Sequence, residues 1–313
     1  MTNAQGTAEA TGAAVDAATT AAGAPGRGIA FLKGHGTEND FVIVPDPDGV
    51  LELSADAVAR ICDRRAGVGG DGLLRVVRSA ADPAARAMAG EAEWFMDYRN
   101  GDGSVAEMCG NGVRVFARYL QHAGLTGEGD FAIATRGGVK RVRLAPTGEV
   151  TVTMGRAELL PDGVTVTVGD RSWPARNVSM GNPHAVAFVE DLDHAGELYD
   201  VPPFSPAAVY PHGVNIEFVA DRGPRHVAMR VHERGAGETR SCGTGACAVA
   251  VATARRDGTD PAVTGSPVTY TVDVPGGSLE ITELPDGTVE MTGPAVIVAQ
   301  GALDPAWLVT ALG

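Results

Sequence analysis

The chain has 313 residues, 44% hydrophobic and 20% charged, which is ample for two domains that each bury a core. Its formal net charge of -14 repels nucleic acid and anionic lipid, so we expect neither as a partner. No run approaches the roughly 20 apolar residues that span a bilayer, and no secretory signal pattern is present. We therefore expect no membrane association and a cytoplasmic protein.

The first 28 residues are mainly Ala, Gly and Thr, with almost no large apolar side chain. Ordering them would cost conformational entropy with little burial in return, so we expect a disordered tail over residues 1–28. Folded sequence begins at Ile29, where two short apolar runs around a polar turn predict a hairpin. Ser54 is the expected N-cap of a helix that runs through about Arg64.

Short strand-like runs fill most of the remaining chain, with few helices between them. Because tight turns rather than crossover helices separate many of these runs, we expect mixed or antiparallel sheets and the α+β class. The final apolar run near residues 295–299 is compatible with a return of the chain to the first domain.

A weak internal repeat is the most informative feature of the chain. Cys109-Gly-Asn-Gly and Cys242-Gly-Thr-Gly lie 133 residues apart, and after each cysteine the apolar residues follow helical spacing. Each motif is therefore expected to open a helix with one buried face. The repeat therefore suggests two similar domains that face one cleft. The first is expected to comprise residues 29–148 with Cys109, completed by residues 290–313. The second is expected to comprise residues 149–289 with Cys242.

A thiol at a helix N-terminus lies near unpaired N–H groups and the positive end of the helix dipole, so we expect lowered pKa values for Cys109 and Cys242. Such a thiolate can act as a base, and the flanking glycines let a carboxylate approach the same N–H groups. Two opposed thiols could remove a proton from an α-carbon and return one to its other face. Pyridoxal phosphate needs a Schiff-base lysine, and neither Lys33 nor Lys140 lies in a phosphate-binding context.

Other polar residues could complete such a site. Arg234 could pair with a carboxylate, and His184 could tune a thiol. Cys62 and Cys247 fall within predicted helices, where packing is the expected role. Loop asparagines are candidate donors to a polar ligand: Asn39, Asn100, Asn111, Asn182 and Asn215.

Taken together, five segments resemble the diaminopimelate epimerase family over essentially everything after the tail. They are KGHGTENDF at 33–41, GVGGDG at 67–72, NGDGSVAEMCGNG at 100–112, GNPH at 181–184 and ERGAGETRSCGTGA at 233–246. The resemblance implies two pseudo-symmetric domains of mixed sheet around a central helix, commonly as a homodimer. It further implies an isomerase that interconverts LL- and meso-2,6-diaminopimelate, in lysine and peptidoglycan biosynthesis, without a cofactor or metal.

The resemblance also implies roles for individual residues. Cys109 and Cys242 match the family's two catalytic bases, and His184 and Glu233 match residues that modulate the pKa values of the thiols. The residues implied to bind substrate are Asn39, Asn100, Gly110, Asn111, Asn182, Asn215, Glu233, Arg234, Gly243 and Thr244.

The sequence leaves three alternative functional hypotheses open. A racemase of a smaller amino acid such as proline would keep both thiols, but it would have no distal amino-acid group for Asn100, Asn215, Glu233 and Arg234 to hold. A redox or metal-binding protein is disfavoured because no C-x-x-C occurs. A noncatalytic binding module would not need the paired thiols.

Overall fold

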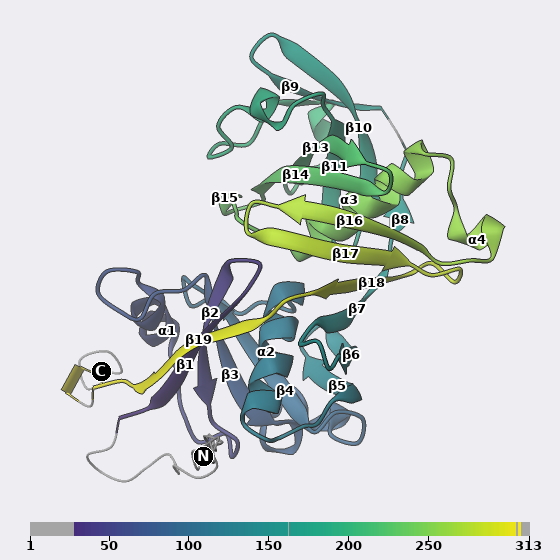
Figure 1. Ribbon diagram of the computed structural model, residues 1–313. Helices are drawn as coiled ribbons and strands as arrows, with labels where there is room; N and C mark the ends of the chain where they lie inside the picture. Colours follow the sequence, from purple (N-terminus) through teal and green to yellow (C-terminus); the bar gives the residue numbers. More distant parts are fainter. Residues whose placement is uncertain (1–27, 162, 305, 308–313) are drawn as a thin grey trace, which may run out of the picture.

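The computed structural model describes residues 28–161, 163–304, 306 and 307. Apart from Gly28, the expected tail over residues 1–28 lies outside the described residues. Figure 1 shows two lobes, with β7 and β18 between them and with β19, from the end of the chain, lying beside β1 in the first lobe. No helix in the described ranges is both long enough and apolar enough to cross a membrane.

The first lobe is a sheet in the order β19, β1, β2, β3, β4, β5, β6, β7. Its strands are β1 (Ala30–Gly36), β2 (Asn39–Pro45), β3 (Gly72–Arg78), β4 (Trp94–Asn100), β5 (Gly129–Thr135), β6 (Gly138–Leu144), β7 (Val150–Arg156) and β19 (Val296–Ala302). Its helices are α1 (Ala55–Cys62), α2 (Gly110–His122) and the 3-10 turns η1 (Ser79–Ala81) and η2 (Arg86–Met88).

The second lobe continues the ladder in the order β18, β17, β16, β14, β13, β11, β10, β9. Its strands are β8 (Glu158–Leu159), β9 (Val164–Val168), β10 (Arg171–Ser179), β11 (Pro183–Phe188), β12 (Phe204–Ser205), β13 (Asn215–Gly223), β14 (His226–Glu233), β15 (Gly237–Glu238), β16 (Val268–Val274), β17 (Gly277–Glu283) and β18 (Thr288–Gly293). Its helices are α3 (Gly243–Arg256), α4 (Pro261–Thr264), η3 (Leu192–Ala195) and η4 (Ala207–Val209).

The pairing pattern is the same on both sides of the antiparallel pair β7–β18. Outward from β7 and outward from β18, successive pairs are antiparallel, antiparallel, parallel, antiparallel, parallel, antiparallel and antiparallel. Helix α2 follows β4 and helix α3 follows β14, which occupy equivalent places in the two patterns. The two halves are therefore pseudo-symmetric α+β units, as the repeat of the cysteine motif predicted.

Each long helix is held by the apolar face that the sequence indicates. In α2, Val113, Phe116 and Leu120 are fully buried, and the helix packs against β1, β2 and β7. Helix α3 is buried almost all round and packs against β11, β16 and β17. Residues from both helices belong to one hydrophobic core, so the starts of the two helices have fixed positions relative to each other.

One sequence expectation about an element boundary needs correction. Helix α1 has the expected N-cap at Ser54 but ends at Cys62, because Asp63 adopts an extended conformation. The final apolar run forms β19, and Pro294 separates it from β18. Proline lacks the N–H that a continuing central strand needs, so the chain leaves the second lobe after β18 and pairs with β1 as β19.

Candidate functional site

Both repeated cysteines lie at the N-caps of the two long helices. Cys109 precedes α2 and Cys242 precedes α3, each with extended backbone dihedral angles. Cys109 is partly buried, while the Cys242 side chain is only 5% exposed. The prediction that each motif opens a helix is confirmed.

Hydrogen bonds join the starts of the two helices directly. Asn111, in the first turn of α2, donates from Nδ2 to the carbonyl oxygen of Ser241, 3.1 Å away, and lies 3.2 Å from its Oγ. The Ser241 hydroxyl also lies 2.6 Å from Thr37 Oγ1, in the β1–β2 turn. Because Ser241 directly precedes Cys242, these contacts place the two cysteine motifs side by side.

Asn39 connects Cys109 to a charged cluster on the first lobe. Its Oδ1 accepts from Asn111 Nδ2 at 3.2 Å and lies 3.5 Å from Cys109 Sγ. Its Nδ2 donates to Asp71 Oδ2 at 2.7 Å, and Asp71 also pairs with Arg64 at 2.6 Å. The carboxylate of Asp71 therefore fixes the orientation of the Asn39 amide, with its oxygen toward the thiol.

Cys242 lies at the end of a polar chain on the second lobe. Its Sγ lies 3.7 Å from Thr244 Oγ1, and Asn182 Nδ2 donates to that hydroxyl at 3.3 Å. Asn182 Oδ1 lies 3.0 Å from His184 Nε2, and His184 Nδ1 lies 2.6 Å from Glu217 Oε1. His184 therefore reaches the thiol through two side chains rather than by direct contact.

The remaining predicted substrate-binding side chains lie in three different environments. Asn215 donates to the Pro183 carbonyl at 3.1 Å and accepts from the Arg234 backbone N–H at 2.9 Å. The Arg234 guanidinium is exposed and donates to the His212 carbonyl at 3.4 Å, with no ion pair in the part of the chain that the structure describes. Asn100 bonds to Ser104 Oγ at 2.9 Å and has no hydrogen bond to either cysteine within the described ranges.

Pseudo-symmetry relates these positions in pairs. Asn39 follows the β1–β2 turn and Asn182 lies in the β10–β11 turn, and these turns are equivalent. Asn100 and Glu233 end the equivalent strands β4 and β14. Equivalent segments of the two halves thus carry polar residues at equivalent positions, as expected for a site assembled between two related halves.

The thiol pKa values differ from the sequence expectation. Burial raises the pKa of Cys109 from its ordinary 9.0 to about 11, with a further increase from Glu233. Burial also raises the pKa of Cys242 well above 9.0, and the carboxylates of Glu233 and Glu217 add to this. The N–H groups at the helix starts do lower both values, as expected, but desolvation of the thiolate is the larger effect.

Two charged groups lie beside the thiols, the half-buried Glu233 and the fully buried Arg114. Burial raises the pKa of Glu233, whose Oε2 accepts from the Thr239 hydroxyl at 2.9 Å. Burial lowers the pKa of Arg114 to about 10, so this fully buried guanidinium stays charged at neutral pH. Its charge in turn lowers the pKa of Cys109.

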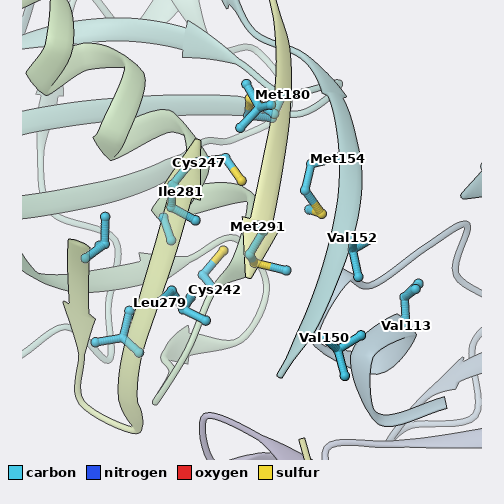
Figure 2. Packing of buried hydrophobic residues seen from close by; sticks show 14 of the residues in the cluster. Val113, Val150, Val152, Met154, Met180, Cys242, Cys247, Leu279, Ile281 and Met291 are labelled. Atoms are coloured by element: carbon cyan, nitrogen blue, oxygen red, sulfur yellow. The ribbon is translucent and has the colours of Figure 1, made fainter. Parts of the chain in front are cut away.

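Two methionines from the central strand pair support the helix starts. A Cβ at Gly110 would lie 2.7 Å from Met154 Cε and 2.8 Å from Met291 Cε, so only glycine fits there without a shift. Met154 comes from β7 and Met291 from β18. Figure 2 shows Met291 beside Cys242, with Cys247 further into the same core. Both Cys62 and Cys247 are buried at packing positions in hydrophobic clusters.

Sequence reasoning missed Glu217, Asp71, Ser241 and Arg114 as contributors to the site. Glu217 had a detectable signal, since it lies two residues after Asn215 in an apolar strand and so faces the same side. The role of Ser241 depends on contact between the two halves, which no local pattern contains. Within residues 28–161, 163–304 and 306–307, no three His, Cys, Asp or Glu side chains cluster as metal ligands would.

Comparison with known proteins assigns this arrangement to a family. The family model for diaminopimelate epimerase matches residues 31–160 and 176–298. The chain belongs to the diaminopimelate epimerase family. The diaminopimelate epimerase of Streptomyces coelicolor is 78% identical over 281 residues, covering 90% of this chain and 97% of the relative. That of Thermobifida fusca is 50% identical over 275 residues, covering 87% and 96%.

Solved structures extend the fold beyond the diaminopimelate epimerase family. A phenazine biosynthesis protein of the PhzF family from Bacillus anthracis superposes with a TM-score of 0.65 at 16% identity, covering 88% of this chain and 98% of that one. A hydroxyproline epimerase from Agrobacterium vitis gives 0.61 at 16% identity, covering 89% and 92%. At this identity the likeness establishes the shared two-lobed fold.

Proposed function

We propose that this protein is an isomerase that interconverts LL- and meso-2,6-diaminopimelate, with Cys109 and Cys242 as its two bases. The observation that carries the proposal is the pair of thiols at the N-caps of two pseudo-symmetric helices, with the first turn of α2 hydrogen-bonded to Ser241, the residue before Cys242. The family match and the named relatives support the same substrate and a place in lysine biosynthesis.

The reaction needs one thiolate and one thiol. The thiolate takes the α-proton and becomes a thiol, while the opposite thiol gives its proton to the other face and becomes a thiolate. The pair carries one proton before and after the reaction, but that proton ends on the cysteine that began as the thiolate. Backbone N–H groups of Gly110, Asn111, Gly243 and Thr244 are proposed to hold the reacting carboxylate, where negative charge develops.

The raised thiol pKa values suit this chemistry. An α-hydrogen is a weak acid, and a thiolate of high pKa is a stronger base than an ordinary one. Burial of Cys109 and Cys242 therefore increases the driving force for proton removal, although it lowers the fraction of thiolate in the free protein. Glu233 raises both values and is proposed, with His184, to adjust the balance between the two thiols.

The distal end of diaminopimelate carries an ammonium and a carboxylate. Glu233 offers acceptor oxygens, and the exposed guanidinium of Arg234 offers donors in a geometry that suits a carboxylate. We assign Asn39, Asn100, Asn182 and Asn215 to the remaining polar contacts with substrate. A smaller amino acid such as proline has no distal ammonium or carboxylate, so Glu233 and Arg234 would have no substrate group to bind.

The proposal includes a cytoplasmic homodimer that acts without a cofactor. Support for self-association comes from β19, which pairs with β1 alone among the described strands and exposes 43% of Val296 and 60% of Val298. An unpaired strand edge with exposed apolar side chains can add the same strand of a second copy. Sedimentation equilibrium gives the mass that tests this.

We also propose the division into residues 29–148 with 290–313 and residues 149–289. The pairing of β19 with β1 supports it, because this strand comes from the end of the chain and adds to the sheet of the first lobe. Under this division β7 and most of β18 each belong to the domain opposite the lobe whose sheet they join, so the boundary passes through the central β7–β18 pair.

The deciding experiment follows deuterium entering the α-position of LL-diaminopimelate by proton NMR in deuterated water. Reduced wild-type protein should produce labelled meso isomer. Cys109→Ala and Cys242→Ala should each lower turnover by at least about 1,000-fold, since each removes one of two required proton-transfer groups. Cys62→Ala, at a buried packing position away from the helix starts, is the matched thiol control and should keep turnover.

Each alternative has its own outcome. Turnover of proline or hydroxyproline in place of diaminopimelate would overturn the substrate assignment but keep the two-thiol mechanism. Binding of diaminopimelate without any exchange would indicate a binding module. Full turnover by either cysteine variant would overturn the two-base mechanism.

A further inference from the structure

A fully buried carboxylate lies behind Cys242 and has no part in the mechanism described above. Glu217 and His184 are both 0% exposed, and Glu217 Oε1 lies 2.6 Å from His184 Nδ1. This distance is typical of a charge-assisted hydrogen bond. The second oxygen, Oε2, has no hydrogen-bond partner in the described part of the chain, so the imidazole of His184 is the hydrogen-bond partner of this carboxylate there.

Donor and acceptor types fix a direction along the chain from Glu217 to Cys242. Asn182 Oδ1 can only accept, so His184 Nε2, 3.0 Å away, must carry a hydrogen. The Asn182 amide then directs Nδ2 toward Thr244 Oγ1, which accepts that hydrogen at 3.3 Å. The Thr244 hydroxyl hydrogen is left free to point at Cys242 Sγ, 3.7 Å away.

From this geometry we infer that Glu217 is a positioning residue for the epimerisation. It holds His184 as an imidazolium, with a hydrogen on each ring nitrogen. His184 thereby orients the Asn182 amide, and the amide orients the Thr244 hydroxyl toward Cys242. A hydroxyl donor stabilises thiolate more than thiol, so the chain favours the form of Cys242 that removes the α-proton. The inference deepens the proposed function and rests on it.

Charge balance explains why the carboxylate needs the imidazolium. Glu217 by itself raises the pKa of Cys242, and so does Glu233 from β14. A buried imidazolium on β11 compensates the charge of Glu217 while leaving the hydrogen-bonded chain intact. Glu233 also interacts with Glu217, and so does Tyr210, whose pKa is raised to about 12 chiefly by burial, so the Tyr210 hydroxyl stays neutral.

The glycine at position 245 keeps this arrangement close to the thiol. A Cβ there would lie 2.8 Å from Glu217 Oε1 and 3.2 Å from Cys242 Sγ. The carboxylate therefore occupies space beside the first turn of α3 that an ordinary side chain would fill.

The test replaces the carboxylate by its neutral isostere, Glu217→Gln. We expect kcat for diaminopimelate to fall about 10- to 100-fold with KM changed less than about threefold, because one charge-assisted contact is lost behind the substrate site. Alkylation of Cys242, mapped by mass spectrometry, should slow by a similar factor, while Cys109 serves as an internal control. The ring-nitrogen NMR signals of His184 should show two N–H groups in wild type and one in the variant.

A double-mutant cycle separates positioning from a structural effect. Thr244→Val removes the hydroxyl and keeps the backbone, so adding Glu217→Gln to it should lower kcat further by less than about twofold. Losses that multiply in the double variant would overturn the inference, as would a single protonated ring nitrogen in wild-type His184. Glu283→Gln is the control for loss of a buried paired carboxylate, since Glu283 is 7% exposed and bonds Arg255 at 2.9 Å.

Failure of the proposed function has a different signature. If wild-type protein does not exchange the α-proton of diaminopimelate, the proposed function fails. If wild type exchanges it and Glu217→Gln is equally fast with unchanged Cys242 alkylation, only the positioning role fails.

Discussion

Arg114 is the most unusual single residue of the site, because its guanidinium is fully buried without a carboxylate partner in the described ranges. Its Nη2 donates to Asn111 Oδ1 at 2.8 Å and to Thr37 Oγ1 at 3.1 Å, while Nε and Nη1 have no hydrogen-bond partner within those ranges. An unpaired buried charge is expensive for folding. The Arg114 charge does not form an ion pair within the described ranges, but it lowers the pKa of Cys109.

Removing this charge should make Cys109 harder to ionise. In Arg114→Met the pKa of Cys109 should rise by roughly one unit, so that alkylation of Cys109 near pH 9 slows about tenfold. The rate of alkylation as a function of pH, resolved by mass spectrometry, measures this. Arg114→Lys keeps the charge and should titrate close to wild type. A Cys109 titration unchanged in Arg114→Met would show that the guanidinium serves packing alone.

At the scale of elements, the third residue after each cysteine distinguishes the two helix starts. Gly112 in α2 and Gly245 in α3 are equivalent in the repeat, and both are helical. A Cβ at Gly112 would make ordinary contacts of 3.4 Å with Cys109 Cβ and Leu74 Cδ2. At Gly245 it would lie 2.8 Å from Glu217 Oε1, so the same substitution meets a buried carboxylate.

These two glycines form a matched pair of variants. Alanine is a better helix former than glycine by about 1 kcal/mol, so Gly112→Ala should keep turnover within about threefold without lowering the thermal midpoint. Gly245→Ala should lower kcat more than about tenfold, because Glu217 must move away from His184 or from the thiol. Turnover and thermal unfolding of both variants check this. Equal turnover in the two variants would mean that displacing Glu217 by a Cβ at position 245 does not affect catalysis.

At the scale of the whole molecule, local patterns predicted the elements and the repeat, but not how the halves meet. The hairpin from Ala30 to Pro45, the helix after Ser54 and both cysteine-capped helices follow from turn chemistry and apolar spacing. The return of β19 to β1 and the contact of Asn111 with Ser241 join residues far apart in sequence. Such contacts depend on tertiary packing, which no sequence window contains.

The same limit explains the thiol pKa values. A helix N-terminus is visible in the sequence, and its lowering effect on the thiol follows from the helix dipole. Burial of Cys109 and Cys242 among methionines and carboxylates of other strands is not visible there, and it decides the direction of the shift. The resemblance to a known family located the residues, whereas the fold supplied their electrostatics.

Buried thiols throughout the molecule should make it unstable at alkaline pH. Burial raises the pKa of Cys62 and Cys247 from 9.0 to about 12, and that of Cys109 to about 11. Below pH 9 the folded and unfolded chains both keep these protons, so the thiols add no pH dependence. Above it the unfolded chain loses protons first, and the free energy of unfolding falls by roughly 1.4 kcal/mol per pH unit for each thiol.

Urea unfolding at intervals from pH 8 to pH 10.5 measures this slope. The double variant Cys62→Ala, Cys247→Ala removes two core thiols that lie outside the proposed chemistry. Its stability at pH 8 should be lower, since two packed sulfur atoms are lost, but its decline above pH 9 should be shallower than that of wild type by about 3 kcal/mol per pH unit. Parallel declines in the two proteins would mean that these thiols ionise in the folded state near pH 9, and that the core around α1 and α3 admits water.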